Sequence, residues 1–305
     1  TSSFYIKKKK IATKNCSNKK LTTTMKKYIF GLMAVAAAMF MTSCSADEGT
    51  EPGNDSKAYV MTNTYSVAPP LDADADFKVR VSTNSATESA YILLEKHADY
   101  SKHIAELGQE GYNDFVVKNG GLVKGVKGQS EVDTLFYGLK GDYMATVVAV
   151  NAKGQAQAAD SVSFTGITWN KVCDGKYYFN EDVAPIVGKE SADCELDVDA
   201  NNPSSYRIKN VYGQGYNVKF KKAKSGSTDE QGNAFNYILV PKFSTGLTYK
   251  TLGTVYMTDA YTLTGSTDYL DNGIYADNSL FICTVYSVAA GNISALKYDQ
   301  FVPNN

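Results

Sequence analysis

Histidine, tryptophan and arginine are scarce in this chain of 305 residues, which has 2 histidines, 1 tryptophan and only two arginines, Arg80 and Arg207. Planar guanidinium groups that clamp phosphate are therefore nearly absent. The formal net charge is -1, but residues 1–43 hold nine lysines and no acid, so the remainder carries 22 basic against 32 acidic residues. An acidic body repels phosphate backbones, and the composition argues against nucleic acid as a partner.

The sequence also lacks the motifs of several enzyme classes. It has no H-E-x-x-H, no G-x-S-x-G and no G-x-x-x-x-G-K-[ST], which argues against zinc peptidases, α/β-hydrolases and phosphate-loop proteins. His97 and His103 are six residues apart and would lie on different faces of a helix, so we expect solvated side chains and no joint role. No catalytic residue, metal ligand or cofactor is predicted.

Three segments precede the first expected domain. Residues 1–24 do not begin with methionine and have no periodic apolar pattern, so we interpret them as an upstream extension of a chain that starts at Met25. Two lysines then lead into a 14-residue apolar run, Tyr28 to Met41, which is short for a bilayer span of about 20 residues. We interpret residues 25–43 as a secretory signal; the alternative is a core helix or a plain transmembrane anchor.

The end of that signal, Met41-Thr42-Ser43-Cys44, resembles the lipobox of bacterial lipoproteins. The resemblance implies that Cys44 becomes the first mature residue and carries lipid, which would anchor the protein in a membrane. Residues 44–56 are polar and contain Gly and Pro, which predicts a flexible tether. The acidic residues close to Cys44 resemble the export signal of Bacteroidetes surface lipoproteins, which implies an exposed position on the outer membrane of the cell envelope.

Residues 57–166 are predicted to form a β-sandwich. Short segments with alternating or β-branched character are separated by turn residues, the usual pattern of such a domain. The expected strands are Tyr59–Val67, Phe77–Ser82, Ala90–Glu95, Val132–Leu139, Tyr143–Ala152 and Ala158–Phe164.

The segment from Leu139 to Gly154 carries a family resemblance. Tyr143, Ala145, Val147 and Ala149 alternate and would face an opposing sheet. With Leu139 before them and Asn151 and Gly154 after them, they resemble the sixth strand of the fibronectin type III domain, an immunoglobulin-like sandwich, in which this tyrosine forms the tyrosine corner. The tryptophan that such domains often carry on an early strand is missing.

A helical insertion is expected at 99–119, where the apolar period changes from two to nearly four. Asp99 can cap a helix that Gly108 would end, and a second short helix would contain Tyr112, Phe115 and Val116. The insertion is similar to those in sandwich domains of Bacteroidetes surface lipoproteins.

Residues 167–305 are predicted to form a second β-rich, sandwich-like domain that resembles C-terminal modules of the same lipoproteins, for which no activity is implied. Its opening segment, Trp169–Tyr177, has the pattern of strand, turn, strand. Further expected strands are Cys194–Val198, Tyr206–Lys209, Tyr216–Phe220, Phe235–Val240, Thr254–Met257, Leu280–Val285 and Ile293–Tyr298.

Cysteines and acids give little further indication of chemistry. Cys173, Cys194 and Cys283 allow one disulfide, best between Cys173 and Cys194, or three buried thiols. The acids of the run Asp193–Asn201 lie on one strand face and could offer oxygen ligands, but Ile208 stands where an EF-hand needs glutamate. We interpret this run, and the run Asp72, Asp74 and Asp76, as solvated.

A non-catalytic surface module that binds a glycan or a protein is the function that these observations favour. Aromatic side chains near Gly- or Asn-containing turns could form its ligand platform. They are Trp169, Tyr212, Tyr216, Tyr269 and Tyr275.

Two alternatives remain. A fimbrillin-like structural or adhesive subunit would need a processed N-terminal strand, and the early mature segment has no arginine for a trypsin-like cut before Arg80. A glycan-processing enzyme would need a cleft in which one carboxyl group is desolvated beside another.

Overall fold

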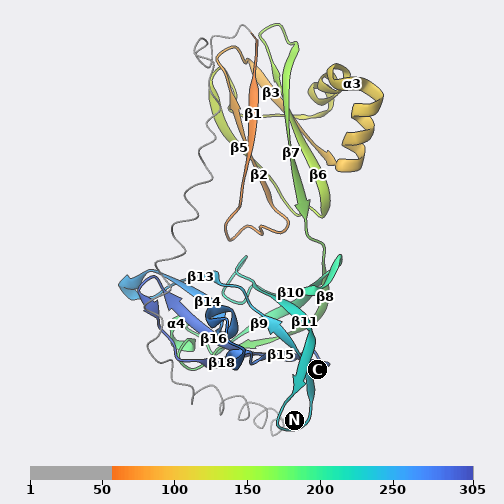
Figure 1. Ribbon diagram of the computed structural model, residues 1–305. Helices are drawn as coiled ribbons and strands as arrows, with labels where there is room; N and C mark the ends of the chain where they lie inside the picture. Colours follow the sequence, from red (N-terminus) through yellow and green to blue (C-terminus); the bar gives the residue numbers. More distant parts are fainter. Residues whose placement is uncertain (1–56, 305) are drawn as a thin grey trace. The chain divides into compact units, whose positions relative to one another are not determined.

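The computed structural model describes residues 57–304 (Figure 1). Strands account for 52% of these residues and helices for 15%, so the prediction of a mainly β chain is confirmed. The chain divides into two compact units: 57–67 with 74–166, and 68–73 with the segment that starts at 167. We call them the N-terminal and C-terminal units and describe each by itself. The predicted signal, Cys44 and the tether lie outside the described residues.

The N-terminal unit contains seven strands and one long helix. They are β1 (Val60–Tyr65), β2 (Phe77–Thr83), β3 (Ser89–Lys96), α3 (His97–Asn119), β4 (Gly121–Leu122), β5 (Ser130–Phe136), β6 (Gly141–Val150) and β7 (Ala156–Gly166). The strands form two antiparallel sheets, one in the order β1-β2-β5 and one in the order β4-β3-β6-β7 (Figure 1).

One buried cluster joins these two sheets. It contains Val79 and Val81 from β2 and Ala145 and Val147 from β6, all at 0% exposure. Alternate residues of each strand point into it, because successive side chains of a strand leave on opposite faces. Tyr143 packs against the same cluster, so the strand face predicted from Tyr143 to Ala149 is present.

Helix α3 packs against the sheet that contains β3 and β6. Tyr112 and Val116 are buried there with Val148 of β6. Gly108 has a φ of 64°, which kinks the helix at the residue predicted to end its first part. The predicted cap at Asp99 was wrong: α3 follows β3 directly, Lys96 is the N-cap, and Asp99 lies in the first turn, where its charge favours the helix dipole.

The C-terminal unit is made of strands and very short helices. The strands are β8 (Trp169–Tyr178), β9 (Ser191–Asp199), β10 (Asn202–Lys209), β11 (Val218–Thr228), β12 (Ala234–Leu239), β13 (Phe243–Thr248), β14 (Thr254–Asp259), β15 (Asn272–Tyr275), β16 (Leu280–Val288), β17 (Gly291–Asn292) and β18 (Lys297–Pro303). The helices are α4 (Ala184–Val187) and α5 (Ala260–Thr264), with 3-10 turns η1 (Lys250–Leu252) and η2 (Thr267–Tyr269). Among residues 57–304, no helix is both long enough and apolar enough to cross a membrane.

Eight strands of this unit form a closed sheet. The order β8-β9-β10-β11-β12-β15-β16-β18 returns to its start because β18 pairs with both β16 and β8. The hairpin β13-β14 follows β12 in the chain but lies outside the closed sheet, and its strand β14 pairs with β16. The second domain was predicted to be sandwich-like, but its strands form one continuous sheet, because the chain's last strand joins the first.

The opening segment also differs from its prediction. Trp169–Tyr178 is one continuous strand with a bulge between Lys171 and Cys173, where strand, turn, strand was expected. Gly175 lies within this strand and pairs with Cys194 on one side and Pro303 on the other. A glycine is needed because a Cβ atom there would lie 2.4 Å from the Phe301 ring and 2.5 Å from the Val302 carbonyl oxygen.

A Gly175→Ala substitution should therefore destabilise the C-terminal unit by about 1–3 kcal/mol, the usual effect of overpacking. Urea unfolding of residues 57–305 measures this as a lower midpoint. Gly121→Ala is the matched control, because its Cβ would meet nothing closer than 4.0 Å. Equal midpoints for the two variants would contradict the argument.

Candidate functional site

The predicted platform residues lie in separate surroundings in the C-terminal unit. The Trp169 ring stacks under the Arg207 guanidinium, whose Cζ is 4.7 Å from the ring centroid. Tyr216 packs against Gly246 of β13, where an added Cβ would lie 2.2 Å from the Tyr216 ring. Both aromatic side chains are therefore used in packing.

The other three also make internal contacts. The Tyr212 hydroxyl lies 2.6 Å from that of Tyr286 in the interior. Tyr269 packs against a small cluster formed by Ala260, Cys283 and Val285. Tyr275 is half-buried on the outer face, and its hydroxyl donates a hydrogen bond of 3.1 Å to Asp229 Oδ2. The structure does not bring the five residues together, but Tyr275 belongs to a different aromatic group described below.

A buried carboxylate is the most unusual titratable group inside the closed sheet. Asp299 of β18 has 0% exposure and accepts hydrogen bonds from Tyr177, Tyr286 and Asn180. The Asn180 backbone N–H and side-chain amide each lie 2.8 Å from Oδ1. Burial raises the pKa of Asp299 to about 6, although these hydrogen bonds oppose the shift.

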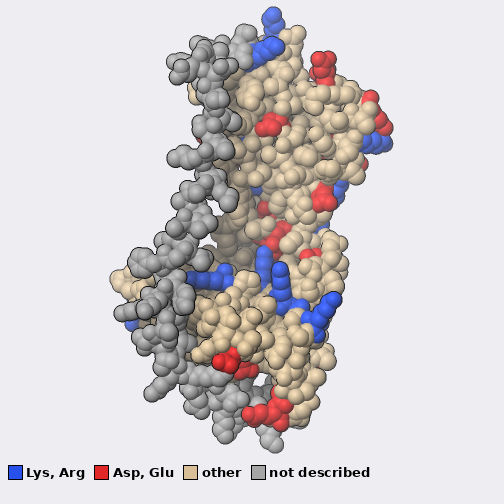
Figure 2. Space-filling model, in the orientation of Figure 1, with Lys and Arg blue, Asp and Glu red and all other residues tan. Residues whose placement is uncertain are grey.

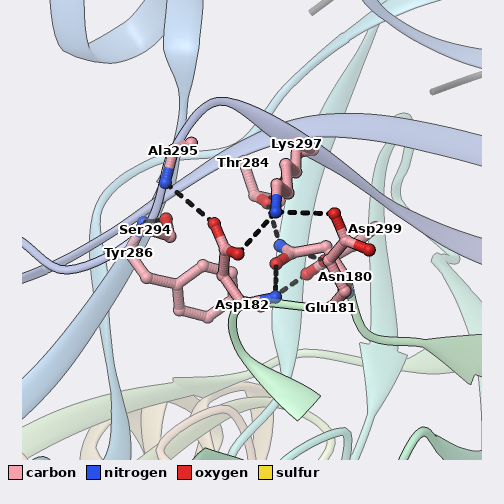
Figure 3. A network of polar contacts seen from close by, with 9 residues as sticks. All are labelled: Asn180, Glu181, Asp182, Thr284, Tyr286, Ser294, Ala295, Lys297 and Asp299. Carbon is pink, nitrogen blue, oxygen red and sulfur yellow. Dashed lines mark hydrogen bonds and ion pairs between the residues drawn. The ribbon is translucent and has the colours of Figure 1, made fainter. Parts of the chain in front are cut away.

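Figure 3 shows the polar contacts around Asn180, Asp182 and Lys297 that extend this network. The Asn180 amide also donates to Thr284 Oγ1 at 3.1 Å, and the neighbouring residues Glu181 and Asp182 bind the Lys297 ammonium at 2.7 and 2.5 Å. Each of these groups has a protein partner, so the network links β8, β16 and β18 within the closed sheet. We assign it a structural role, because Asp299 and its donors are enclosed.

The predicted solvated row of acids on β9 is partly wrong. Asp193 is exposed and binds Lys176 at 2.8 Å, but Asp197 is only 1% exposed. Asp197 Oδ2 accepts from Arg207 Nε at 2.8 Å, and Arg207 Nη1 also binds Asp72 at 2.8 Å. Arg207 on the neighbouring strand is thus what allows a carboxyl group to be buried here. Asp74 is likewise buried, at 6% exposure.

Asp197 also lies beside a second carboxyl group. Its Oδ1 has no hydrogen-bond partner among the described residues. Burial raises the pKa of Asp197, whereas the nearby ammonium groups of Lys171 and Lys209 help to hold the pKa of Glu195 below its ordinary value despite its partial burial. The two carboxyl groups therefore differ in surroundings: Asp197 is enclosed, and Glu195 faces lysines.

This pair does not have the geometry of a glycosidase. Glu195 lines a shallow hollow with Asp174, Lys209 and Asn304, so one carboxyl group is indeed desolvated beside another at an open surface. Glycosidases keep their two carboxyl groups about 5–10 Å apart, which leaves room for the sugar or a water. Asp197 is only 1% exposed and does not line the hollow, so one carboxyl group of the pair reaches it and the other does not.

Cysteine and histidine positions also correct two predictions. Cys173 and Cys194 are free thiols, because Cys173 pairs with Leu196 and Cys194 with Gly175, which offsets them along the two strands. The alternative of three buried thiols is wrong as well, since Cys283 is disulfide-bonded and Cys173 is only partly buried. His103 is not simply solvated: its Nδ1 lies 2.7 Å from Glu95 Oε2. Glu95 also accepts from Tyr112, so these contacts fasten α3 to β3.

An aromatic patch lies on the outer face of the closed sheet. It consists of Phe235, Tyr237, Tyr275, Phe281 and Tyr298, which come from β12, β15, β16 and β18 and are all half-buried. The centroid distances along the row are 5.8 Å from Phe235 to Tyr275, 5.6 Å from Tyr275 to Phe281 and 6.0 Å from Phe281 to Tyr298. The patch is therefore one continuous row of rings across four strands.

The row exists because a glycine lies beneath it. Gly273 of β15 pairs with both Tyr237 and Phe281, and an added Cβ would lie 2.4 Å from the Phe235 ring. The two phenylalanine rings meet over it, 5.1 Å apart and nearly perpendicular. The Tyr298 hydroxyl donates to Asp271, which fixes the last ring of the row.

Of these five residues, only Tyr275 was predicted from the sequence as a site residue. The alternation of Phe235 and Tyr237 was a usable signal, since both leave the same face of one strand. The neighbour relation of β12 with β15, and of β16 with β18, could not be read from the chain order.

No family model matches the sequence, and neither a curated protein nor a solved structure is found to be similar to it.

The buried Asp299 makes stability depend on pH. Because its pKa is about 6 when folded and 3.8 when exposed, the folded state binds more protons between these values. The stabilisation that comes from protonating Asp299 is complete below about pH 4 and is lost as the pH rises through 6. The free energy of unfolding changes by an amount on the order of 3 kcal/mol.

Asp299→Asn should remove this part of the pH dependence of the free energy of unfolding. The measurement is the free energy of unfolding of both proteins from pH 4 to 7, with the wild-type curve falling relative to the variant. Parallel curves would show that Asp299 does not titrate in this range.

Proposed function

We propose that this protein is a lipid-anchored, non-catalytic protein of the bacterial cell envelope that binds a glycan through the aromatic patch of its C-terminal unit. The observation that carries the proposal is the row of rings from Phe235 to Tyr298. Pyranose rings present apolar C–H faces that stack on aromatic side chains, and a row of rings suits a chain of repeating units better than a single small molecule.

The N-terminal unit is proposed to be a fibronectin type III-like sandwich that presents the binding unit at the cell surface. Support comes from its seven antiparallel strands, which divide into sheets of three and four around a shared core. Tyr143 on β6 packs against that core, and the α3 insertion lies between β3 and β4. These features are those expected of a domain from a Bacteroidetes-type surface lipoprotein.

Lipid attachment can be tested directly. In a bacterial host that processes lipoproteins, the full chain should incorporate labelled palmitate, and Cys44→Ser should abolish the label. Cys16→Ser is the control and should keep it, because residue 16 precedes the proposed start at Met25. A labelled Cys44→Ser protein, or an unlabelled wild type, would contradict the anchor.

Glycan binding is tested with residues 57–305 on a polysaccharide array. Phe281→Leu and Tyr237→Leu keep an apolar side chain but remove a ring face, so each should weaken binding by up to about tenfold, as expected for an aromatic contact of 0.5–1.5 kcal/mol.

Tyr65→Leu is the matched control, because Tyr65 is a 46% exposed tyrosine of the N-terminal unit outside the patch. Unchanged thermal unfolding must accompany any loss of binding. If no glycan binds, or if the control loses binding equally, the proposal fails. Head-to-tail polymers in place of binding would instead support a fimbrillin-like subunit.

A further inference from the structure

Two aspartate side chains border the aromatic patch. Asp229, in the turn between β11 and β12, accepts the Tyr275 hydroxyl, and Asp271, just before β15, accepts the Tyr298 hydroxyl. Within residues 57–304 no lysine, arginine or histidine forms an ion pair with either carboxylate. No ion pair with another described residue therefore offsets the charge of these side chains next to the rings.

The turn that contains Asp229 keeps this carboxylate ionised. Burial would raise its pKa, but hydrogen bonds from the Asn233 side chain and backbone and from Tyr275 lower it overall. The Asn233 backbone N–H lies 2.8 Å and that of Gln231 lies 2.9 Å from Asp229 Oδ1. This geometry holds the charge in place beside the Tyr275 ring.

The negative charge of these acids affects the pKa of a tyrosine within the patch. The pKa of Tyr275 is raised well above its ordinary value, first by burial and then by the charge and hydrogen bond of Asp229, with further contributions from Asp277 and Asp271. The patch thus combines aromatic faces with a negative potential. A cation gains from both, through the ring quadrupole and through the carboxylates.

We infer that the patch selects glycans that contain protonated amino sugars over neutral sugars and over uronic acids. The sugar ring would contact Phe281 and Tyr298, and its ammonium group would bind Asp229 or Asp271. A uronic acid polymer would place like charges beside these carboxylates, which costs affinity. This inference rests on the proposed glycan-binding function and adds the chemical class of the ligand.

Titration calorimetry on residues 57–305 can test this selectivity. The probes are chitosan oligosaccharides, N-acetylated chitin oligosaccharides of equal length, oligogalacturonates and polylysine, at a pH where the chitosan amines are protonated. We expect chitosan to bind at least tenfold more tightly than chitin, with the difference shrinking at high salt because the carboxylates are near the surface. Oligogalacturonates should not bind.

Asp271→Asn and Asp229→Asn are nearly isosteric and keep an oxygen that can accept the tyrosine hydroxyl, so each should lower the ratio of chitosan to chitin affinity towards one. Asp271→Asn is the cleaner of the two tests, because the Asp229 side chain also orders a turn and the Asp271 side chain does not. Asp193→Asn is the control: this exposed acid on β9 pairs with Lys176, away from the rings, and should leave the ratio unchanged.

The outcomes separate the two claims. Equal binding of chitin and chitosan would overturn the selectivity and leave glycan binding intact. Absence of binding to every glycan would overturn both. Binding of polylysine as tightly as chitosan, with the same dependence on Asp271, would overturn the amino-sugar assignment in favour of a basic protein partner.

Discussion

Closure of the C-terminal sheet depends on one strand, β18, which hydrogen-bonds to β8 on one edge and to β16 on the other. Closing a sheet removes free edges from the ring and forces alternate side chains into an interior that must be filled. Tyr177, Phe220, Ile282 and Phe301 do so. Asp299 lies on the same closing strand, so the charged group and the closure are fixed together.

The polar interior explains why a carboxylate can be buried here. Asp299 receives donors from β8, from the segment after it and from β16, so its position requires all three elements to be in register. A buried acid without such donors would cost several kcal/mol. The same logic applies outside the ring, where Arg207 compensates Asp197 and stacks on Trp169. In both places the burial of an acid is a consequence of strand pairing.

The aromatic patch on the outer face of the closed sheet depends on the same closure. Strands β12, β15, β16 and β18 become neighbours, although 38 residues separate the start of β12 from that of β15. Their aromatic residues then form a single row, and Gly273 leaves the space in which two rings meet. The carboxylates of Asp229 and Asp271 lie at turns beside this row, which gives an apolar surface a negative border.

Local chemistry explains what could be read from the sequence. Alternation from Tyr143 to Ala149, the change of period at 99–119 and the turn residues between segments are short-range patterns, and they correctly indicated strands, a kinked helical insertion and a mainly β chain. The row of rings, the free thiols of Cys173 and Cys194 and the buried acids Asp197 and Asp299 were decided by the tertiary structure alone. Each depends on which strands become neighbours and in which register, and pairing between distant segments leaves no mark in the spacing of nearby residues.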